Sequence, residues 1–411
     1  MKMNFDRLEI RNPEKREADD FRALRALLKA SKSKAPALAR QLRGIDISRL
    51  KDRASLATVP VFRKSDLLAL QKARPPFAGF AATKTGALRR LLMSPGPILD
   101  PEGYGLDWWG TGRAMFAAGF RRGDVVLNTF SYHFTPGGVL FESGAHALGC
   151  AVIPAGPGQT EQQLDAITAF SPNAYAGTPD FLKILIEKAE EAGRPATSIK
   201  KALVSGAAFP PSLKDWVTAK GISACQSYAT ADLGTVAYES LGQPGLIINE
   251  GLIVEIVKPG TNDPVPDGEV GEIVVTRLNA DYPLLRFGTG DLSKILPGLS
   301  PCGRTNKRLA GWMGRADQRT KVKGMFVDPA QIDAIAKAHA GLGRLRLVVT
   351  RVNEQDQMTL RAESADSSAG LVEKIGNSLQ VLTKLKGVVE IVKPGSLPND
   401  GKVIADERPI G

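Results

Sequence analysis

The sequence predicts an α/β protein with a large N-terminal domain built on mostly parallel sheets, a β subdomain attached to it, and a small α+β C-terminal domain. Three observations support this fold class. From about residue 104, short apolar runs alternate with helical segments, as they do when parallel strands are buried between helices. Residues 245–295 lose this alternation and are typical of strands joined by turns. A separate α+β pattern follows the glycine-containing segment 311–324.

Length and composition describe an ordinary globular chain. Its 411 residues exceed one average domain, and 43% hydrophobic with 24% charged residues exclude a disordered or fibrous chain. No uncharged apolar run approaches the ~18 residues of a membrane span, and the charged start is not that of a secretory signal. The three cysteines lie far apart and form neither a disulfide framework nor a close-spaced zinc site. A cytoplasmic location is therefore expected.

The chain is basic. It has 54 Lys and Arg residues against 43 Asp and Glu residues, a net charge of +11, which suits anionic partners such as nucleotides, coenzyme A, nucleic acid or a membrane surface. Aromatic residues make up only 6% of the chain, and the aromatic-rich basic strip of a single-strand binder is missing. A solvated basic surface is therefore favoured over nucleic-acid binding, and neither nucleic acid nor a membrane is expected as a partner.

Residues 1–80 are predicted to be mainly helical. Phe21, Leu24 and Leu28 recur at helical spacing, and Leu38 and Leu42 repeat a similar pattern. The basic residues between them are expected on the solvent-facing side of these helices.

The alternating region is predicted to supply the parallel sheet. Its apolar runs are short and bounded by turn residues, which is typical of buried strands. The expected order is helix 108–118, strand 125–130, helix 137–148, strand 151–154, helix 160–170, strand 174–176, helix 180–192, strand 202–205 and strand 222–227. Sheets of this kind bind ligands at the carboxyl ends of their strands. The turns Gly156–Gly158, Gly177–Pro179 and Ser205–Ala207 are therefore the first candidates for a site.

The rest of the chain divides into two parts. Strands 253–257 and 271–275 flank a turn-rich stretch, which predicts an antiparallel β region. Farther on, Asp328 can cap a helix that has Pro329 at its first position. A small α+β unit is completed by strands 345–350, 358–362 and 388–392 and by helix 368–384. The predicted domains are accordingly 1–313 and 314–411.

Two carboxylates and a tyrosine suggest a nucleotide site. Asp291 follows two glycines in the segment Arg286–Leu292, so it can accept two ribose hydroxyl groups where the backbone approaches a ligand. An aspartate in a glycine-rich turn is the alternative. Tyr228 follows a strand and can stack on a purine. Asp232 can face Mg²⁺ or can simply cap a helix.

Lys402 lies in Ser396–Lys402, whose Pro, Asn, Asp and Gly predict an exposed turn. A lysine there is either a solvated charge or a mobile cation that is brought to a phosphate. His133 follows strand 125–130 and can line a pocket. The sequence has no G-x-S-x-G elbow and no close His/Cys ligand set, so serine hydrolysis and His/Cys metal catalysis are not supported.

Together these segments resemble the adenylate-forming superfamily of acyl-CoA synthetases, and its phenylacetate–CoA ligase branch in particular. The resemblance extends from about residue 75 to the C-terminus, and Pro283–Leu292 is similar to the family's ribose-binding motif. The other matching segments are Thr135–Gly138, Ala151–Gly156, Ala176–Pro179, Cys302–Arg304, Gly314–Asp317, Lys321–Gly324 and Pro398–Lys402.

The resemblance implies two half-reactions. A carboxylate attacks the α-phosphate of Mg·ATP to give acyl-AMP and pyrophosphate. A small, mobile C-terminal domain then rotates, and the thiol of coenzyme A attacks the acyl-AMP. These steps need an anchored nucleotide and positive charge on the phosphates more than a protein nucleophile. ATP and coenzyme A would thus be substrates, with Mg²⁺ as the cofactor.

The resemblance also implies roles for individual residues. Asp291 would hold the ribose hydroxyls, Arg315 would contact ribose or phosphate, and Lys402 would bridge the carboxylate and the α-phosphate. Asp317 would be the hinge, and Asp232 would lie near Mg²⁺. The adenine and acyl sites would be bordered by Ser205, Gly206 and Ala207, with Tyr228 near adenine and with Tyr132, His133 and Phe134 around the acyl group.

The chain departs from the family pattern in three places. The phosphate loop, usually rich in Ser, Thr and Gly, is here Met93–Gly103, in which prolines remove backbone donors and two carboxylates appear. The Y-G-x-T-E motif has become Tyr-Ala-Thr-Ala-Asp at 228–232, and the branch's usual cysteine after Tyr-Glu is Ser240. The first two departures bear on how efficiently the chain uses ATP.

The predicted function is an ATP-dependent, AMP-forming acyl-CoA ligase for an aromatic or similarly compact carboxylic acid. The main alternative, which the altered loop favours, is a non-catalytic relative that binds nucleotide, acyl-AMP or acyl-CoA. Against it, a pure binder needs neither the hinge at Asp317 nor the mobile Lys402. An adenylating enzyme with an acceptor other than coenzyme A is a third alternative. The oligomeric state stays open, with a homodimer as one option.

Overall fold

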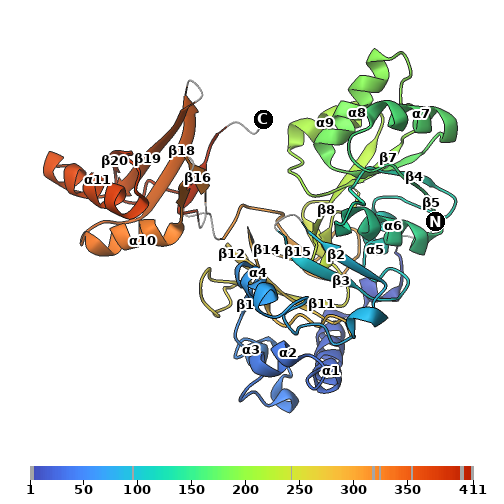
Figure 1. The fold of residues 1–411 in the computed structure, drawn as a ribbon, viewed down its shortest axis with the longest axis horizontal. Helices are drawn as coiled ribbons and strands as arrows, with labels where there is room; N and C mark the ends of the chain where they lie inside the picture. The colour runs from blue at the N-terminus through green and yellow to red at the C-terminus, as the bar shows by residue number, and fades with distance from the viewer. Residues whose placement is uncertain are drawn as a thin grey trace. The chain divides into compact units, whose positions relative to one another are not determined.

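The computed structural model describes residues 4–94, 97–241, 243–316, 320–323, 325–352, 355–398 and 402–408. The chain divides into two compact units, which are described separately (Figure 1). The larger unit comprises Met1–Glu269, Ile273–Thr289 and Ser293–Trp312. The smaller unit comprises Val270–Glu272, Gly290–Leu292 and Met313–Gly411.

The N-terminal segment of the larger unit is mainly helical, as predicted. It contains the 3₁₀ turns Arg7–Ile10, Ile47–Arg49 and Thr85–Ala87, the helices α1 (Pro13–Ser31), α2 (Pro36–Gln41), α3 (Arg53–Leu56) and α4 (Lys64–Ala73), and the short strand β1 (Phe62–Arg63). α1 begins where Asn12 Oδ1 accepts the Lys15 N–H at 3.0 Å. Its buried face carries Phe21, Leu24 and Leu28, so the apolar spacing seen in the sequence is the face that packs inward.

A nine-stranded sheet dominates the larger unit. Its strands are β4 (Val125–Asn128), β5 (Ala151–Pro154), β6 (Ala174–Gly177), β7 (Lys201–Val204), β8 (Ser223–Thr230), β9 (Gly234–Tyr238), β10 (Leu246–Ile248), β14 (Ile295–Leu296) and β15 (Arg308–Leu309). They lie in the order β14-β15-β10-β9-β8-β7-β6-β4-β5. The strands from β5 to β8 pair in parallel, and those from β8 to β14 pair antiparallel. The predicted parallel sheet is confirmed, and it continues into an antiparallel part.

Helices cover both faces of this sheet, as predicted. They are α5 (Gly112–Ala117), α6 (Pro136–Leu148), α7 (Thr160–Phe170), α8 (Pro179–Glu191) and α9 (Pro211–Ala219). Along β4, Val126 packs in a cluster with residues of α5 and α6, whereas Leu127 packs with residues of α7 and α8. Successive side chains of a strand point to opposite faces, so the two clusters are two separate layers of core.

The helix predicted over residues 108–118 begins later than expected, at Gly112. Asp107 has a left-handed backbone conformation, with φ +56°. Its carboxylate accepts the N–H groups of Thr111 and Gly112 at 2.7 and 2.9 Å, and burial raises the pKa of Asp107 to about 6. Trp108 and Trp109 therefore lie in a turn and not in the first turn of a helix.

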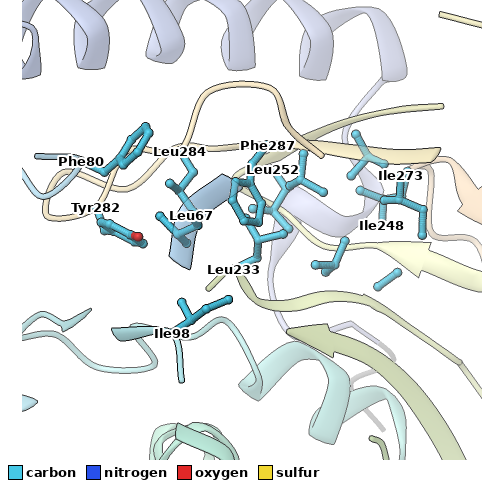
Figure 2. Close-up of a cluster of buried hydrophobic side chains, with 14 of the residues drawn as sticks. Leu67, Phe80, Ile98, Leu233, Ile248, Leu252, Ile273, Tyr282, Leu284 and Phe287 are labelled. Carbon is cyan, nitrogen blue, oxygen red and sulfur yellow. The ribbon is translucent and has the colours of Figure 1, made fainter. Parts of the chain in front are cut away.

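A four-stranded sheet with the order β1-β13-β12-β11 forms the predicted β region. Its longer strands are β11 (Leu252–Val257), β12 (Gly271–Arg277) and β13 (Phe287–Ser293), and β1 pairs in parallel with β13. The strands β2 (Arg90–Met93) and β3 (Leu99–Glu102) form a separate two-stranded antiparallel sheet. Figure 2 shows the apolar cluster that these elements share, in which Leu67 of α4 meets Phe287 of β13 and Leu252 of β11.

Arg286 ties four segments of the larger unit together. Its side chain is fully buried and forms a two-bond ion pair with Glu255, at 3.0 and 3.1 Å. It also donates to the carbonyl oxygens of Ala57, Val59 and Asn262 at 2.9, 2.6 and 2.9 Å. A buried guanidinium needs such partners for its donors, so Arg286 fixes where β11, β13 and the N-terminal segment lie.

The smaller unit is an α+β unit, as predicted. Its elements are β16 (Thr320–Val322), β17 (Met325–Val327), α10 (Pro329–Ala338), β18 (Leu345–Val352), β19 (Gln355–Glu363), α11 (Ala369–Thr383), β20 (Val388–Val392) and β21 (Ile404–Asp406). The sheet order is β20-β19-β18-β21, and α10 begins directly after Asp328 as expected. The sequence pattern missed β21, which has only three residues. None of the helices in the part of the chain that the structure describes has the length and apolarity of a membrane crossing.

Leu67 and Leu70 on α4 offer a matched test of the core in Figure 2. Leu67 is fully buried, whereas Leu70 is 37% exposed. Leu67→Ala should lower the free energy of unfolding by about 2–5 kcal/mol because it leaves a cavity. Leu70→Ala should cost much less. Chemical denaturation of the full chain measures both, and similar losses for the two variants would contradict the assignment of this core.

Candidate functional site

The carboxyl ends of the parallel strands bring two of the three predicted turns, Gly177–Pro179 and Ser205–Ala207, together with the turn after β4. The third, Gly156–Gly158, follows β5, and the Gly156 N–H donates to Asn128 O of β4 at 3.1 Å. Ser205 follows β7, and its N–H donates to Gly177 O of β6 at 3.1 Å while its Oγ donates to Ser227 O of β8 at 2.7 Å. A Cβ atom at Gly206 would lie 3.7 Å from the Phe130 ring and 3.8 Å from Thr178. The turns after β4, β6 and β7 therefore meet at one edge of the sheet, where ligands bind in folds of this kind.

Hydrogen bonds between the side chains of the strands and the turns hold this edge of the sheet in place. Thr129 Oγ1 donates to the Tyr175 hydroxyl at 2.8 Å, and Tyr175 donates to Thr178 O at 3.1 Å. A Cβ at Gly177 would lie 2.1 Å from Thr129 Oγ1, so only glycine fits there. Ser205 is buried by its two bonds, whereas Gly206 and Ala207 are exposed. Gly206 and Ala207 are thus the members of this turn that a ligand can reach.

The three residues assigned to the acyl pocket have different surroundings. Tyr132 is half-buried, its hydroxyl accepts Asn128 Nδ2 at 2.8 Å, and burial raises the pKa of Tyr132 well above its ordinary value. A Cβ at Gly138 of α6 would lie 2.7 Å from the Tyr132 ring. His133 and Phe134 are exposed, and Phe134 O accepts the Met93 N–H of β2 at 2.9 Å. Tyr132 is therefore a fixed, neutral phenol, and the other two lie at the surface.

Tyr228 lies in β8 opposite Ala237 of β9, where the strand register shifts. The ring is half-buried and packs against the apolar cluster of Figure 2. Tyr228 therefore belongs partly to the core, and only part of its surface is open to a ligand.

Asp232 lies in the turn between β8 and β9, not before a helix. Its side chain is fully buried, and Lys64 Nζ donates to Asp232 Oδ2 at 2.6 Å. Arg277 Nη1 donates to Asp232 O at 3.0 Å. Lys64 is the first residue of α4. No local sequence pattern indicated this pair, because its members lie 168 residues apart in the chain.

A second buried carboxylate lies close to this pair. Asp100 of β3 has no exposed surface, and burial together with the charge of Asp232 raises the pKa of Asp100 well above its ordinary value. Among the described residues, both carboxylate oxygens of Asp100, Asp232 Oδ1 and the Tyr282 hydroxyl have no hydrogen-bond partner. Lys64 and Arg277 supply positive charge around these groups.

This arrangement does not fit Mg²⁺ at Asp232, the role that the family resemblance implied. Mg²⁺ prefers an open set of oxygen ligands that includes several waters. One oxygen of Asp232 already holds an ammonium group, and the carboxylate is closed to solvent. Within the described ranges, no group of three His, Cys, Asp or Glu side chains could hold a metal ion.

The segment that resembles the family's phosphate loop begins at the end of β2 and contains β3, and these two strands pair antiparallel. The Ser94 N–H and Oγ both donate to Ile98 O, at 2.8 and 3.2 Å. Asp100 and Glu102 are buried, and Arg90 holds both oxygens of Glu102 at 3.0 and 2.9 Å. The two carboxylates therefore do not face a triphosphate from the surface. Pro95 and Gly96 lie outside the described residues.

In the smaller unit, Asp291 and Arg315 form an ion pair. Arg315 Nη1 lies 3.2 Å from Asp291 Oδ1, and Asp291 is only 8% exposed. Gly290 has φ +77°, and a Cβ there would lie 2.7 Å from Arg315 Nη2. Glycine at 290 thus lets the guanidinium approach the backbone beside Asp291. The approach of a ligand to these glycines, which the motif suggested, stays a prediction.

Lys402 is exposed and precedes β21. A Cβ at Gly314 would lie 3.3 Å from Lys402 Cε, so the lysine stem lies beside the segment that leads to Arg315. Asp317, the predicted hinge, lies outside the described residues.

Known proteins resemble this chain along nearly its whole length. A family model for AMP-binding enzymes matches residues 107–279. A phenylacetate–coenzyme A ligase of Aromatoleum evansii is 28% identical over 396 residues, which cover 89% of this chain and 88% of that protein. A phenylacetate–coenzyme A ligase of Pseudomonas putida is 31% identical over 303 residues, or 70% of this chain and 66% of the relative.

The fold also resembles a solved ligase. The crystal structure of a 2-hydroxyisobutyryl-CoA ligase, in complex with 2-HIB-AMP and CoA in the thioesterification state, matches with a TM-score of 0.72. The sequence identity is 25%, and the match covers 99% of this chain and 93% of that one.

Removing the cation beside Asp232 tests the buried pair. Lys64→Met should lower the free energy of unfolding by about 3–5 kcal/mol because it leaves a buried carboxylate without its partner. Lys72→Met is a matched control, since Lys72 is exposed on the same helix. Thermal unfolding measures both variants. Asp232→Asn should recover part of the loss in the Lys64→Met background, and a wild-type melting temperature for Lys64→Met would contradict the pairing.

Proposed function

The chain belongs to the adenylate-forming, AMP-binding enzymes and is phenylacetate–CoA ligase-like, and we propose that it is an AMP-forming acid–CoA ligase. The observation that carries the proposal is the match of both units, over nearly the whole chain, to a ligase that was crystallised with an acyl-AMP and CoA. The Asp291–Arg315 pair in the segment similar to the ribose-binding motif supports it. The substrate is an aromatic or similarly compact carboxylic acid.

The reaction has two steps. In the first, a carboxylate oxygen of the acid bonds to the α-phosphorus of ATP, the bond to the β-phosphate oxygen breaks, and pyrophosphate leaves. In the second, the sulfur of coenzyme A gives up its proton and bonds to the acyl carbon, and AMP leaves. Both steps depend on holding the reactants in place and on neutralising phosphate charge, so the chain needs no covalent nucleophile of its own.

Nucleotide binding is assigned to the two glycine-containing turns and the ion pair. Asp291 accepts the ribose hydroxyls, and Arg315, which donates to Asp291 at 3.2 Å, orients this carboxylate and contacts ribose or phosphate. The exposed Gly206 and Ala207 border the adenine and acyl sites, and Ser205 holds their turn in place through its bonds to β6 and β8. The open part of the Tyr228 ring lies against adenine.

Different segments of the chain are assigned to contact the acyl group and the phosphates. Tyr132, whose hydroxyl is held by Asn128 Nδ2, forms one wall of the acyl pocket, with His133 and Phe134 at its mouth. Lys402 bridges the acid and the α-phosphate during adenylation. Mg²⁺ enters with ATP as its complex, and no step is assigned to a metal held by Asp232, because that carboxylate is paired with Lys64.

The rotation of the C-terminal domain between the two half-reactions is assigned to the linker between the domains. We place the boundary at 313/314 and the hinge at Asp317, on the strength of the sequence motif alone. A cytoplasmic location is supported by the three cysteines, all of which are free thiols.

A non-catalytic binder of acyl-AMP or acyl-CoA is the second candidate. One observation favours it: the Ser94 N–H and Oγ both donate to Ile98 O, whereas an anion-binding loop directs its donors at phosphate. Acid-dependent exchange between ATP and pyrophosphate separates the candidates when it is measured over a panel of carboxylic acids. AMP release that requires coenzyme A then identifies the acceptor. Absence of exchange with every acid, together with tight binding of acyl-AMP, would support the binder.

Lys402→Ala should reduce adenylation by ~10²-fold or more because it removes a positioned cation from the α-phosphate. Thioester formation from supplied acyl-AMP should survive, since that step does not use Lys402. Lys393→Ala, at another exposed lysine of the same region, serves as the control and should leave both steps unchanged. An equal loss of both half-reactions in Lys402→Ala would argue against the assigned role.

The hydrogen bonds of Ser94 to Ile98 O also lead to a prediction about nucleotide affinity. AMP and an acyl-AMP mimic should bind clearly more tightly than ATP, because Ser94 spends its donors on Ile98 and not on the β- and γ-phosphates. Adenylation should need millimolar ATP, at the upper end of usual KM values, which are on the order of 1 μM to 1 mM. Calorimetry with the three ligands measures the affinities. Replacing residues 94–99 with Ser, Thr and Gly should lower the KM for ATP, and tight ATP binding by the unaltered chain would refute the argument.

A further inference from the structure

The loop that carries Lys402 is fastened by two arginines at the start of the small unit's sheet. Arg344 Nη1 donates to Leu397 O at 3.0 Å, on the N-terminal side of the loop. Arg346 of β18 donates from Nη2 to Pro398 O and from Nε to Lys402 O, both at 3.1 Å. Residues 399–401, between these carbonyls, lie outside the described part of the chain. A single guanidinium therefore bridges the two ends of the loop.

Arg346 is suited to this task by burial and by shape. It is only 9% exposed, so its donors depend on protein acceptors more than on water. The planar guanidinium presents Nε and Nη in a fixed fork. The two carbonyl oxygens that bind this fork, Pro398 O and Lys402 O, are therefore held at a fixed spacing. The fork thus fixes the backbone at Lys402.

Other contacts fix the surroundings of the loop. Glu363 Oε1 accepts the Leu397 N–H at 2.8 Å, and this backbone bond lowers the pKa of Glu363. On the other side, Leu347 N donates to Val403 O at 2.9 Å, where β21 joins β18. The described residues on both sides of 399–401 are thus held by hydrogen bonds within the small unit.

A pocket of about 280 Å³ opens beside the loop within the small unit, and its lining includes Ile332, Ala336, Pro398 and Lys402. Side-chain packing therefore leaves this side of the loop unfilled. The Arg346 guanidinium contributes polar contacts on both sides of this segment, at Pro398 O and Lys402 O.

We propose that Arg346 is a positioning residue for adenylation, which sets the backbone of Lys402 so that the ammonium group reaches the α-phosphate from a fixed base. A lysine side chain has four rotatable bonds and a compact charge, so its backbone is the part that the fold can fix. Small displacements of a catalytic group are costly, since ~1 Å can reduce a rate by ~10²-fold. The link to adenylation rests on the proposed function. The contacts of Arg346 with Pro398 O and Lys402 O, called the clasp below, do not.

Arg346→Lys is the sharpest variant because it keeps the charge and removes the fork. Adenylation should fall by ~10-fold or more, in kcat rather than in KM for ATP or acid, since the groups assigned to bind ATP and the acid lie elsewhere. Thioester formation from supplied acyl-AMP should be unchanged. Arg361→Lys, at an exposed arginine of β19 that pairs with Glu390 at 2.9 Å, is the matched control and should behave as wild type.

A double variant separates positioning from general damage to the unit. If Arg346 acts through Lys402, adding Arg346→Lys to Lys402→Ala should cause no further loss of adenylation. An additive loss, or an equal loss of both half-reactions in Arg346→Lys, would overturn the proposal.

Limited proteolysis tests whether Arg346 holds the backbone at Lys402, and it needs no measurement of enzyme activity. Trypsin cuts after lysine and arginine alike, so Arg346→Lys leaves the number of cleavage sites unchanged. Cleavage after Lys402, followed by mass spectrometry, should be several-fold faster in Arg346→Lys than in wild type or Arg361→Lys. If the wild-type protein shows no exchange with any acid, the proposed ligase function fails while this measurement still decides on the clasp. An unchanged rate of cleavage would overturn it.

Discussion

The buried guanidinium of Arg286 is the interaction on which the arrangement of the larger unit depends. It holds Glu255 of β11 through two bonds and takes carbonyl oxygens from residues 57, 59 and 262. A charge buried without such partners would be strongly destabilising, so these segments must come together wherever Arg286 lies. Arg286 directly precedes β13, and the same strand carries Asp291 five residues later. The strand that presents the proposed ribose ligand is thus fixed at its beginning by a structural ion pair.

Arginine plays this organising part throughout the chain. Buried arginines include Arg16, Arg277, Arg286, Arg304, Arg308 and Arg346. Arg304 pairs with Glu9 of the N-terminal segment, and Arg16 pairs with Glu250. The five donors of a guanidinium let one side chain hold several backbone and carboxylate oxygens at once. The net charge of +11 is therefore not only a solvated surface, as the sequence suggested, because part of the arginine content is structural.

Both segments that depart from the family pattern in the sequence, 93–103 and 228–232, contain buried carboxylates. Lys64, Asp100, Asp232 and Arg277 form a buried polar cluster in which two carboxylates face two cations. In the neighbouring hairpin, the Ser94 hydroxyl donates to the backbone oxygen of Ile98. In this chain these charged groups lie inside the fold and interact with one another. This difference ties the altered sequence at 93–103 and 228–232 to one structural cause and explains why the proposed enzyme should handle the nucleoside monophosphate end better than the triphosphate end.

The sequence by itself determined the parallel strands from Val125 to Val204, their helices, the turns at the carboxyl ends of the strands and the helix after Asp328, because apolar periodicity, glycine and proline act over a few residues. It also indicated Asp291 and Lys402 through short motifs. Only the tertiary structure decided that Asp232 pairs with Lys64, that Asp100 and Glu102 are buried, that the first helix of the sheet begins at Gly112, and that Arg346 bridges the ends of the Lys402 loop. Three of these four join residues far apart in the chain or depend on burial, and the helix start depends on a backbone conformation of Asp107. A local pattern carries no information about which distant partner will neutralise a charge, since that choice is made by the packing of the whole unit.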